Sequence, residues 1–330
     1  MPLNIFILFC YLVGSVYSRD IQYILEETLV SEDAFAGESF HFQPMVSLYE
    51  ENTGAIATGF QGDVYAILIS GPTGHEKLRF NGTIGSTTDN AVTFYGGIAT
   101  FKDLTLNEAG SGYRLRYIAR KYVGGEVIEV AQVTGKQFSN ARGQPHHLNF
   151  VVYPGSASGG LMLEPQPIIA IADLGGNTID SINEGYVIAE LGWQNNITMG
   201  GEVVKLRGQT TIAIENGIAV FTDLFIHEAS IEPYHIVFRL YRTPPLAVGT
   251  WQLEESVLKS NPFGVGIGAP YALQLLSSPS DGLALGGSAF ESPALLELVD
   301  AGGNRIVGNS HDYVQVNFAR NPWGAQLLPH

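Results

Sequence analysis

The chain has 330 residues, of which 45% are hydrophobic and 15% charged, a composition typical of globular rather than disordered proteins. A formal net charge of −15 without any basic cluster argues against nucleic acid and anionic membranes as partners. The single cysteine, Cys10, lies in the apolar N-terminal run, so the rest of the chain has no disulfide, zinc–thiolate site or cysteine nucleophile.

Residues 1–18 have the features of a signal peptide. The run "NIFILFCYLVGSVYS" is shorter than the ~20 residues of a comfortable bilayer span. Val16 and Ser18 are small residues at the −3 and −1 positions that a signal peptidase requires. No Lys or Arg precedes the apolar core, and the alternative is an anchor that stays uncut. We expect a secreted chain, or one on the extracellular face of the cell surface, with no membrane insertion after cleavage.

Apolar residues beyond the leader recur mostly with a spacing of two. Tyr113, Leu115 and Tyr117 alternate with arginines, and Tyr234, Ile236, Phe238 and Leu240 follow the same pattern. Further strands are expected at 63–69 and 186–191. Since 39 Gly and 16 Pro supply turns between such segments, the sequence predicts an all-β protein built from half-buried antiparallel strands.

Two phrases repeat along the chain. "GGIATFKDLTL" at 96–106 returns as "NGIAVFTDLFI" at 216–226, and Tyr113 and Tyr234 follow the two copies. A second phrase occurs three times, anchored on prolines. Seven residues therefore serve as repeat anchors: Pro44, Pro167, Pro293, Gly97, Gly217, Tyr113 and Tyr234. A repeat of about 120 residues has the size of a domain rather than of a solenoid unit.

The repeats predict modules at 19–143, 146–268 and 271–330. We expect Phe101, Leu115, Phe221 and Ile236 to be core residues. The third module lacks the "GIA" phrase but carries an alternating segment at 313–318, so we expect it to be incomplete. It would be the front half of a sandwich that continues in a longer chain, or one that borrows strands from another subunit.

The segment "NEAGSGYRL" at 107–115 resembles the end of an immunoglobulin-like domain, where a Tyr opens strand F. Leu115 and Ile236 stand where disulfide-bonded members have their second cysteine. The full pattern resembles the tandem immunoglobulin-like modules of large cell-surface proteins, including invasin-type and filamin-type repeats. The resemblance implies stacked β-sandwiches without disulfides that act as adhesive arms, spacers or ligand-binding ectodomains.

Several motifs suggest chemistry, but each has a structural explanation. "GVGIGA" at 264–269 lacks the following helix of a phosphate fingerprint, so we interpret 264–270 as a linker, like 141–145. His146 and His147 are adjacent, and neighbours on a strand point to opposite faces, which favours a junction role over metal chelation. Asp103 and Asp223 are expected to accept backbone hydrogen bonds at bends.

Oxygen-bearing side chains also gather near tight turns. Asp173, Asn177 and Asp180, with Asp300 and Asn304, either bond the turn backbone or bind calcium at a module junction. We expect the turn role, and no cofactor. No Ser/His/Asp arrangement is evident, so we predict that the chain is not an enzyme.

The sequence favours a non-catalytic ectodomain whose partner is an unidentified extracellular protein or a glycan. Asn81 and Asn196 begin glycosylation sequons. The alternative is a carbohydrate-binding accessory region of a larger secreted enzyme or receptor. Planar aromatic platforms distinguish the two, and the tryptophan candidates are Trp193, Trp251 and Trp323.

Overall fold

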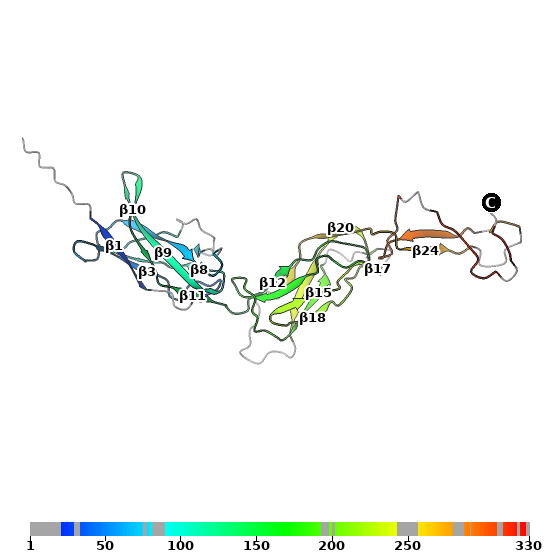
Figure 1. Cartoon of the computed structure of the whole chain (residues 1–330), viewed down its shortest axis with the longest axis horizontal. Coiled ribbons are helices and arrows are strands. Elements are labelled where there is room, and N and C mark those ends of the chain that lie inside the picture. The colour runs from blue at the N-terminus through cyan, green and yellow to red at the C-terminus, as the bar shows by residue number, and fades with distance from the viewer. Residues whose placement is uncertain are drawn as a thin grey trace, which may run out of the picture. The chain divides into compact units, whose positions relative to one another are not determined.

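The protein is all-β: every helix or strand in the described part of this computed structural model is a strand. The chain divides into two compact units, Met1–Arg142 and Gly143–His330 (Figure 1). The structure describes residues 21–29, 34–74, 78–80, 90–192, 198–199, 202–242, 257–279, 287–290, 292–308, 313–321 and 324–327.

The first unit is a two-sheet sandwich. One sheet has the order β1-β3-β7, from Tyr23–Leu29, Met45–Glu50 and Ile98–Thr100. The other has the order β2-β11-β9-β4-β6, from Ala34–Phe35, Phe138–Ala141, Gly110–Val123, Gly62–Ser70 and Val92–Thr93. In addition, β10 (Glu126–Thr134) pairs with β9, and β5 (Leu78–Phe80) pairs with β8 (Leu104–Leu106). With β2 parallel to β11, this is the A-B-E and A′-G-F-C arrangement of an immunoglobulin-like sandwich.

The second unit repeats these pairings. Its first sheet has the order β12-β14-β19, from His147–Val152, Ile168–Ala172 and Ile218–Val220. Opposite it lie β13-β23-β20 (Ala157–Ser158, Phe263–Gly266, Ser230–Tyr234) and β18-β15-β21-β22 (Thr211–Ala213, Tyr186–Leu191, Ile236–Tyr241, Val257–Lys259). A short pair joins β16 (Thr198–Met199) to β17 (Glu202–Val203). The matching strand order expected from the repeats is confirmed.

One difference separates the two copies. The single strand β9 corresponds to β20 followed by β21, because the second copy is interrupted between Tyr234 and Ile236. Pro233 lies next to this break and has no N–H to donate to a neighbouring strand. The two tyrosines nevertheless pair with equivalent residues, Phe138 and Phe263.

Each sandwich has its own hydrophobic core. Phe101 and Leu115 are 0% and 2% exposed, and Phe221 and Ile236 are 1% and 0% exposed, so the predicted core residues are confirmed. The alternation that the sequence predicts places the arginines of β9 on the opposite face. Because the chain lacks disulfides, apolar burial replaces the bridge of disulfide-bonded immunoglobulin domains.

The repeated "GIA" phrase begins with a tight hairpin turn. Gly96 and Gly97 have φ angles of 59° and 80°, and Asn216 and Gly217 have φ angles of 51° and 73°. Two consecutive positive φ angles are the mark of a type I′ turn, which favours Asn-Gly and Gly-Gly. A Cβ on Gly217 would also collide with the carbonyl oxygen of Ile179. The phrase is thus a turn followed by the strand β7 or β19.

A tyrosine corner fixes the next bend in both sandwiches. The Tyr113 hydroxyl donates to the Glu108 carbonyl at 2.7 Å, and the Tyr234 hydroxyl donates to the Glu228 carbonyl at 3.0 Å. This bond to the backbone a few residues upstream is a hallmark of immunoglobulin-like domains. The tyrosines that open the predicted strand F therefore have a structural role.

The described residues beyond 270 form one antiparallel pair, β24 (Ala272–Ser277) with β25 (Leu295–Val299). The strand predicted at 313–318 is absent, since these residues have no neighbouring strand to bond. The interpretation of 264–270 as a linker is also wrong in part. Phe263–Gly266 forms β23, in which Phe263 and Val265 are buried while the two glycines face outward and disguise the alternation.

Candidate functional site

A hydrogen-bonded turn connects the third module to the second. The carboxylate of Asp300, 1% exposed, accepts from the backbone N–H groups of Gly302 at 2.9 Å and Asn304 at 2.8 Å. Its other oxygen accepts from the N–H of Gly268 at 2.8 Å. A buried carboxylate is stable only with such compensation, so this side chain holds the turn and the incoming connection together.

Asn304 extends the contact into the second module. Its side-chain amide donates to the His227 carbonyl at 2.7 Å, and its side-chain oxygen accepts from the Ala229 N–H at 2.9 Å. Gly159 and Gly302 pack closely here, because a Cβ on either would collide with Asn304 or with the His227 carbonyl. We call Asp300, Asn304, His227, Ala229 and Gly268 together the module joint.

The electrostatics of the module joint favour an ionised Asp300. Burial alone would raise the pKa of this carboxyl, but the hydrogen bonds from Gly268, Asn304 and Gly302 lower the pKa below its ordinary value. Asp173, 0% exposed, makes the same use of its oxygens, which accept from the N–H groups of Asn177 and Gly143 at 2.8 and 2.9 Å. These oxygens face N–H donors, which is the turn role expected for both aspartates.

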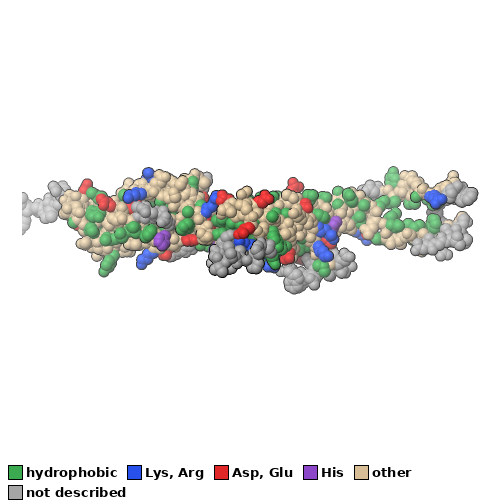
Figure 2. Space-filling view, turned by 90° about the horizontal axis from the view of Figure 1, so that it is seen from below, with side chains coloured by type: hydrophobic (Ala, Val, Ile, Leu, Met, Phe, Trp, Pro, Cys, Tyr) green, Lys and Arg blue, Asp and Glu red, His purple; other side chains and the backbone are tan. Residues whose placement is uncertain are grey.

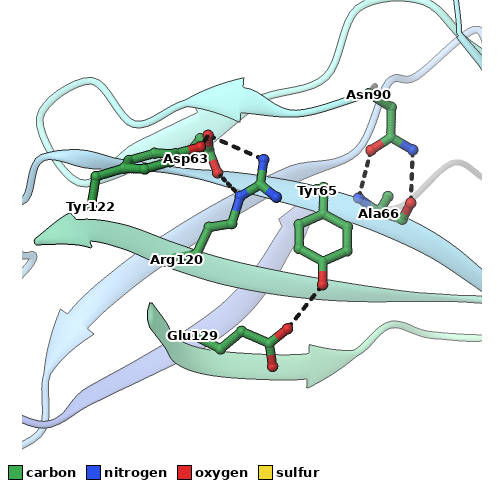
Figure 3. A network of polar contacts seen from close by, with 7 residues as sticks. All are labelled: Asp63, Tyr65, Ala66, Asn90, Arg120, Tyr122 and Glu129. Atoms are coloured by element: carbon green, nitrogen blue, oxygen red, sulfur yellow. Dashed lines mark hydrogen bonds and ion pairs between the residues drawn. The ribbon is translucent and has the colours of Figure 1, made fainter. Parts of the chain in front are cut away.

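A second organised cluster lies on the outer face of the first unit. Asp63 on β4 lies opposite Arg120 on β9, and Arg120 lies opposite Glu129 on β10. Figure 3 shows the resulting row of acidic, basic and acidic side chains across three strands, with Tyr65 and Tyr122 beside it. We call these five residues the tyrosine–arginine face.

Close contacts fix the geometry of the tyrosine–arginine face. Arg120 Nε donates to Asp63 Oδ1 at 2.5 Å, and the Tyr122 hydroxyl donates to Asp63 Oδ2 at 2.6 Å. The Tyr65 hydroxyl donates to Glu129 Oε1 at 3.0 Å, and the guanidinium carbon of Arg120 lies 4.8 Å from the centre of the Tyr65 ring. Such charge-assisted and cation–π contacts hold the guanidinium plane and both rings in place.

These contacts keep Arg120 protonated and the hydroxyls of Tyr65 and Tyr122 neutral near neutral pH. The hydrogen bond to Asp63 raises the pKa of Arg120 although burial opposes it. Burial, followed by the hydrogen bond to Glu129, raises the pKa of the Tyr65 hydroxyl, and the bond to Asp63 raises the pKa of Tyr122. Both tyrosines therefore stay neutral donors, so the face has features of a binding surface rather than of a proton-transfer site.

The edge of this face is apolar and open. Tyr122 is 55% exposed, and its cross-strand partner Val127 is 54% exposed. Asn90 stiffens the same sheet, because its side-chain amide accepts from the Ala66 N–H at 3.0 Å and donates to the Ala66 carbonyl at 2.7 Å (Figure 3). The arrangement offers a preorganised polar and aromatic surface without a nucleophile activated by a base.

The remaining anchors from the sequence have backbone roles. The carbonyls of Pro44 and Pro167 accept from the N–H groups of Phe101 at 2.9 Å and Phe221 at 3.1 Å. The carbonyl of Pro293 accepts from the Ser277 hydroxyl at 3.2 Å. The prolines thus mark where the strands β3 and β14 begin to pair with the "GIA" strands.

Two further expectations need correction. The Nδ1 atoms of His146 and His147 lie 3.2 Å apart, although strand geometry was expected to separate them, because His146 precedes β12 and is not constrained by its pleat. Asp223 accepts a backbone hydrogen bond, as expected, but from Gln209 at 2.8 Å rather than from its own bend. Among the described residues, no three His, Cys, Asp or Glu side chains cluster as metal ligands would.

Several predicted sites lie outside the described residues. These are the signal peptide, the sequons at Asn81 and Asn196, and the tryptophans Trp193, Trp251 and Trp323. No helix in the described part of the chain has the length and hydropathy needed to cross a bilayer. The tyrosine–arginine face could not be predicted from the sequence. Its residues come from three strands, and the pairing register of those strands cannot be read from one sequence.

Comparison with known proteins gives no family. No family model and no curated protein matches the chain. It is similar to mouse protocadherin-24 EC1-3 at a TM-score of 0.22 and 11% identity, covering 73% of this chain and 70% of that one. For a marsupial T cell receptor the TM-score is 0.21 and the identity 9%, with 77% of each chain covered. For a β-glycosidase from Bacteroides vulgatus the TM-score is 0.24 and the identity 11%, and the match covers 74% of this chain and 25% of that one.

These similarities do not indicate a function for this chain, because the TM-scores are far below 0.5. The chain covers 25% of the β-glycosidase and 26% of latent PorU from Porphyromonas gingivalis, which is a small share of either. The immunoglobulin-like assignment therefore depends on the chain's own strand order and tyrosine corners.

Proposed function

We propose that the chain is a non-catalytic extracellular array of immunoglobulin-like modules that acts as an adhesive arm or spacer. The observation that carries this proposal is the module joint. A spacer must hold one module against the next, and Asn304 does this with two hydrogen bonds to the backbone of the second module. The polar groups of the joint bond backbone groups and do not converge on a pocket, as catalytic groups would.

Backbone relaxation measured by NMR on the full chain tests the spacer role. We expect residues 147–266 and 272–299 to share one rotational correlation time. Replacing Asn304 by Ala should separate the two values, whereas replacing the exposed Asn321 by Ala should not. Independent tumbling in the unmodified chain would contradict the proposal.

A second candidate function is recognition of a glycan by the tyrosine–arginine face. Sugar rings present C–H faces that pack on aromatic rings and hydroxyls that bond carboxylates and guanidinium groups. This face offers an exposed Tyr122 ring beside Arg120, Asp63 and Glu129, all held in place before a ligand arrives. Such preorganisation lowers the entropy lost on binding.

Screening the chain on a glycan array tests this second function. We expect Tyr122→Ala to weaken binding to any glycan hit by about tenfold, the loss of ~1.4 kcal/mol that an aromatic contact gives. Tyr95 provides the matched control, since it is 92% exposed in the turn that leads into β7 of the other sheet. Equal losses for Tyr122→Ala and Tyr95→Ala, or no hit at all, would exclude the face as a glycan site.

A further inference from the structure

The β24–β25 pair corresponds strand for strand to β12–β14. Leu273 pairs with Leu298 and Leu275 with Leu296, as Leu148 pairs with Ile171 and Phe150 with Ile169. Both pairs have a register shift at the same place, between Leu275 and Ser277 in one and between Phe150 and Val152 in the other. The strand register therefore identifies which leucines of the third module correspond to core residues of the second module.

Two of these leucines, Leu273 and Leu275, are exposed, and the other two, Leu296 and Leu298, are half-buried. Leu148 is 3% exposed and Ile169 and Ile171 are each 1% exposed, whereas Leu273 is 52% and Leu275 is 53% exposed. Figure 2 shows hydrophobic side chains beside a hollow near the C-terminal end of the chain. A groove of about 410 Å³ lies over this face. Its lining combines apolar residues with two charged ones: Pro270, Leu273, Leu296, Leu298, Ile306, Tyr313 and Val314, with Glu297 and Arg305.

The two complete sandwiches show which strand pairs with the edge that corresponds to the free edge of β25. There, β3 and β14 each have a second neighbour, the "GIA" strand β7 or β19. Ala99 lies opposite Val46 and Ala219 lies opposite Ile169, and Ile169 corresponds to Leu296. In the described residues β25 has β24 as its neighbour and no strand on its other edge.

The backbone of this free edge also offers a hydrogen-bond donor to an added strand. The N–H of Leu48 donates to Gly97 and the N–H of Ile171 donates to Gly217, each at 2.8 Å. Leu298 holds the same position, and its carbonyl accepts from Ile306 at 2.8 Å, as that of Ile171 accepts from Ile179 at 2.9 Å. Among the described residues no glycine carbonyl reaches the N–H of Leu298. A strand edge with such a donor is a template for strand addition.

We propose that the β25 edge and its groove form an acceptor site for an antiparallel β-strand of the pattern Gly-Ile-Ala-x-Phe, supplied by a polypeptide outside residues 271–330. The glycine carbonyl of that strand accepts from Leu298, its alanine lies opposite Leu296, and its phenylalanine covers the start of β25. In the complete modules the equivalent Phe101 and Phe221 are buried and donate their N–H groups to Pro44 and Pro167. The proposal does not depend on the spacer or glycan functions.

A labelled synthetic peptide of residues 216–226, "NGIAVFTDLFI", tests the acceptor site on the full chain by fluorescence anisotropy. We expect saturable binding, protection of the Leu298 amide from hydrogen exchange, and little binding of a scrambled peptide. Replacing Ala219 in the peptide by Asp should weaken binding by at least about tenfold, because the charged side chain would lie opposite the apolar Leu296. Because the substitution is in the peptide, the folded chain itself is unchanged.

The acceptor side has a matched pair of substitutions. Leu296→Asp should abolish binding, whereas Leu276→Asp should not, because Leu276 corresponds to Val151, which is 53% exposed in the complete module. No saturable binding below about 1 mM, equal binding of the scrambled peptide, or equal effects of the two Asp variants would overturn the proposal. A dimer formed through the β25 edge that the peptide does not dissociate would also overturn it.

Discussion

Replacing Asn304 by Ala should open the module joint while the β-sheets of the second module stay folded. The substitution removes the bonds to the His227 carbonyl at 2.7 Å and from the Ala229 N–H at 2.9 Å. At roughly 1 kcal/mol of net stability for each, the loss is about 2 kcal/mol. Since ~1.4 kcal/mol changes an equilibrium tenfold, the opening equilibrium of the joint should rise about 30-fold.

Hydrogen exchange of the Ala229 amide measures this opening directly, and we expect its exchange rate to rise by the same factor of about 30. Asn321→Ala provides the control, because the Asn321 side chain bonds the backbone of Ala325 in an exposed turn. An unchanged Ala229 rate would refute the reasoning that Asn304 holds the joint. Faster exchange throughout β14 and β21 would refute it differently, by showing that the joint and the sandwich unfold together.

Four other substitutions test further parts of the structure. Phe221→Ala should lower the free energy of unfolding of the second unit by about 3–5 kcal/mol, the usual range for a core phenylalanine, as measured by urea denaturation. Tyr113→Phe and Tyr234→Phe should each cost about 1 kcal/mol, because each removes the tyrosine-corner bond, and an effect below the detection limit would exclude that role. The pKa of Asp300 is lower in the folded chain, so its stabilisation of the joint is present above the ordinary carboxyl pKa and is lost as pH falls through the folded value. Asp300→Asn should remove that acid sensitivity from the exchange of the Gly268 amide, and an unaltered pH profile would assign it to another carboxyl.

The fold was largely predictable because the signals that specify it are local. The spacing of two in β9 and β21, the Asn216-Gly217 turn and the repeat anchors each specify backbone geometry over a few residues. The repeat then supplied the long-range part, since one pattern used twice predicts one topology used twice. The resemblance placed a tyrosine at the start of strand F, but the tyrosine-corner hydrogen bonds are a tertiary feature that only the structure shows.

Three features were not predictable, each for a physical reason. Glycines occupy the outward positions of β23, so its alternation resembled a linker. The segment 313–318 alternates as a strand does, yet a strand forms only where a neighbour bonds its backbone. The tyrosine–arginine face depends on Asp63, Arg120 and Glu129 sharing one cross-strand row, and register across three strands is a tertiary property.

Disulfide trapping of equivalent strand pairs tests the central claim, that the two units contain the same immunoglobulin-like register. Ser47 lies opposite Ile98, and Ala170 lies opposite Ile218. With Cys10 replaced by Ser, the double substitutions Ser47→Cys with Ile98→Cys and Ala170→Cys with Ile218→Cys should each form a disulfide in the folded chain, because directly opposed strand residues meet the required Cα spacing of about 4.4–6.8 Å. Leu48→Cys with Ile98→Cys should not, since a shift of one residue turns the side chain to the other face. Cross-linking in only one unit, or in the shifted pair, would contradict the repeated register.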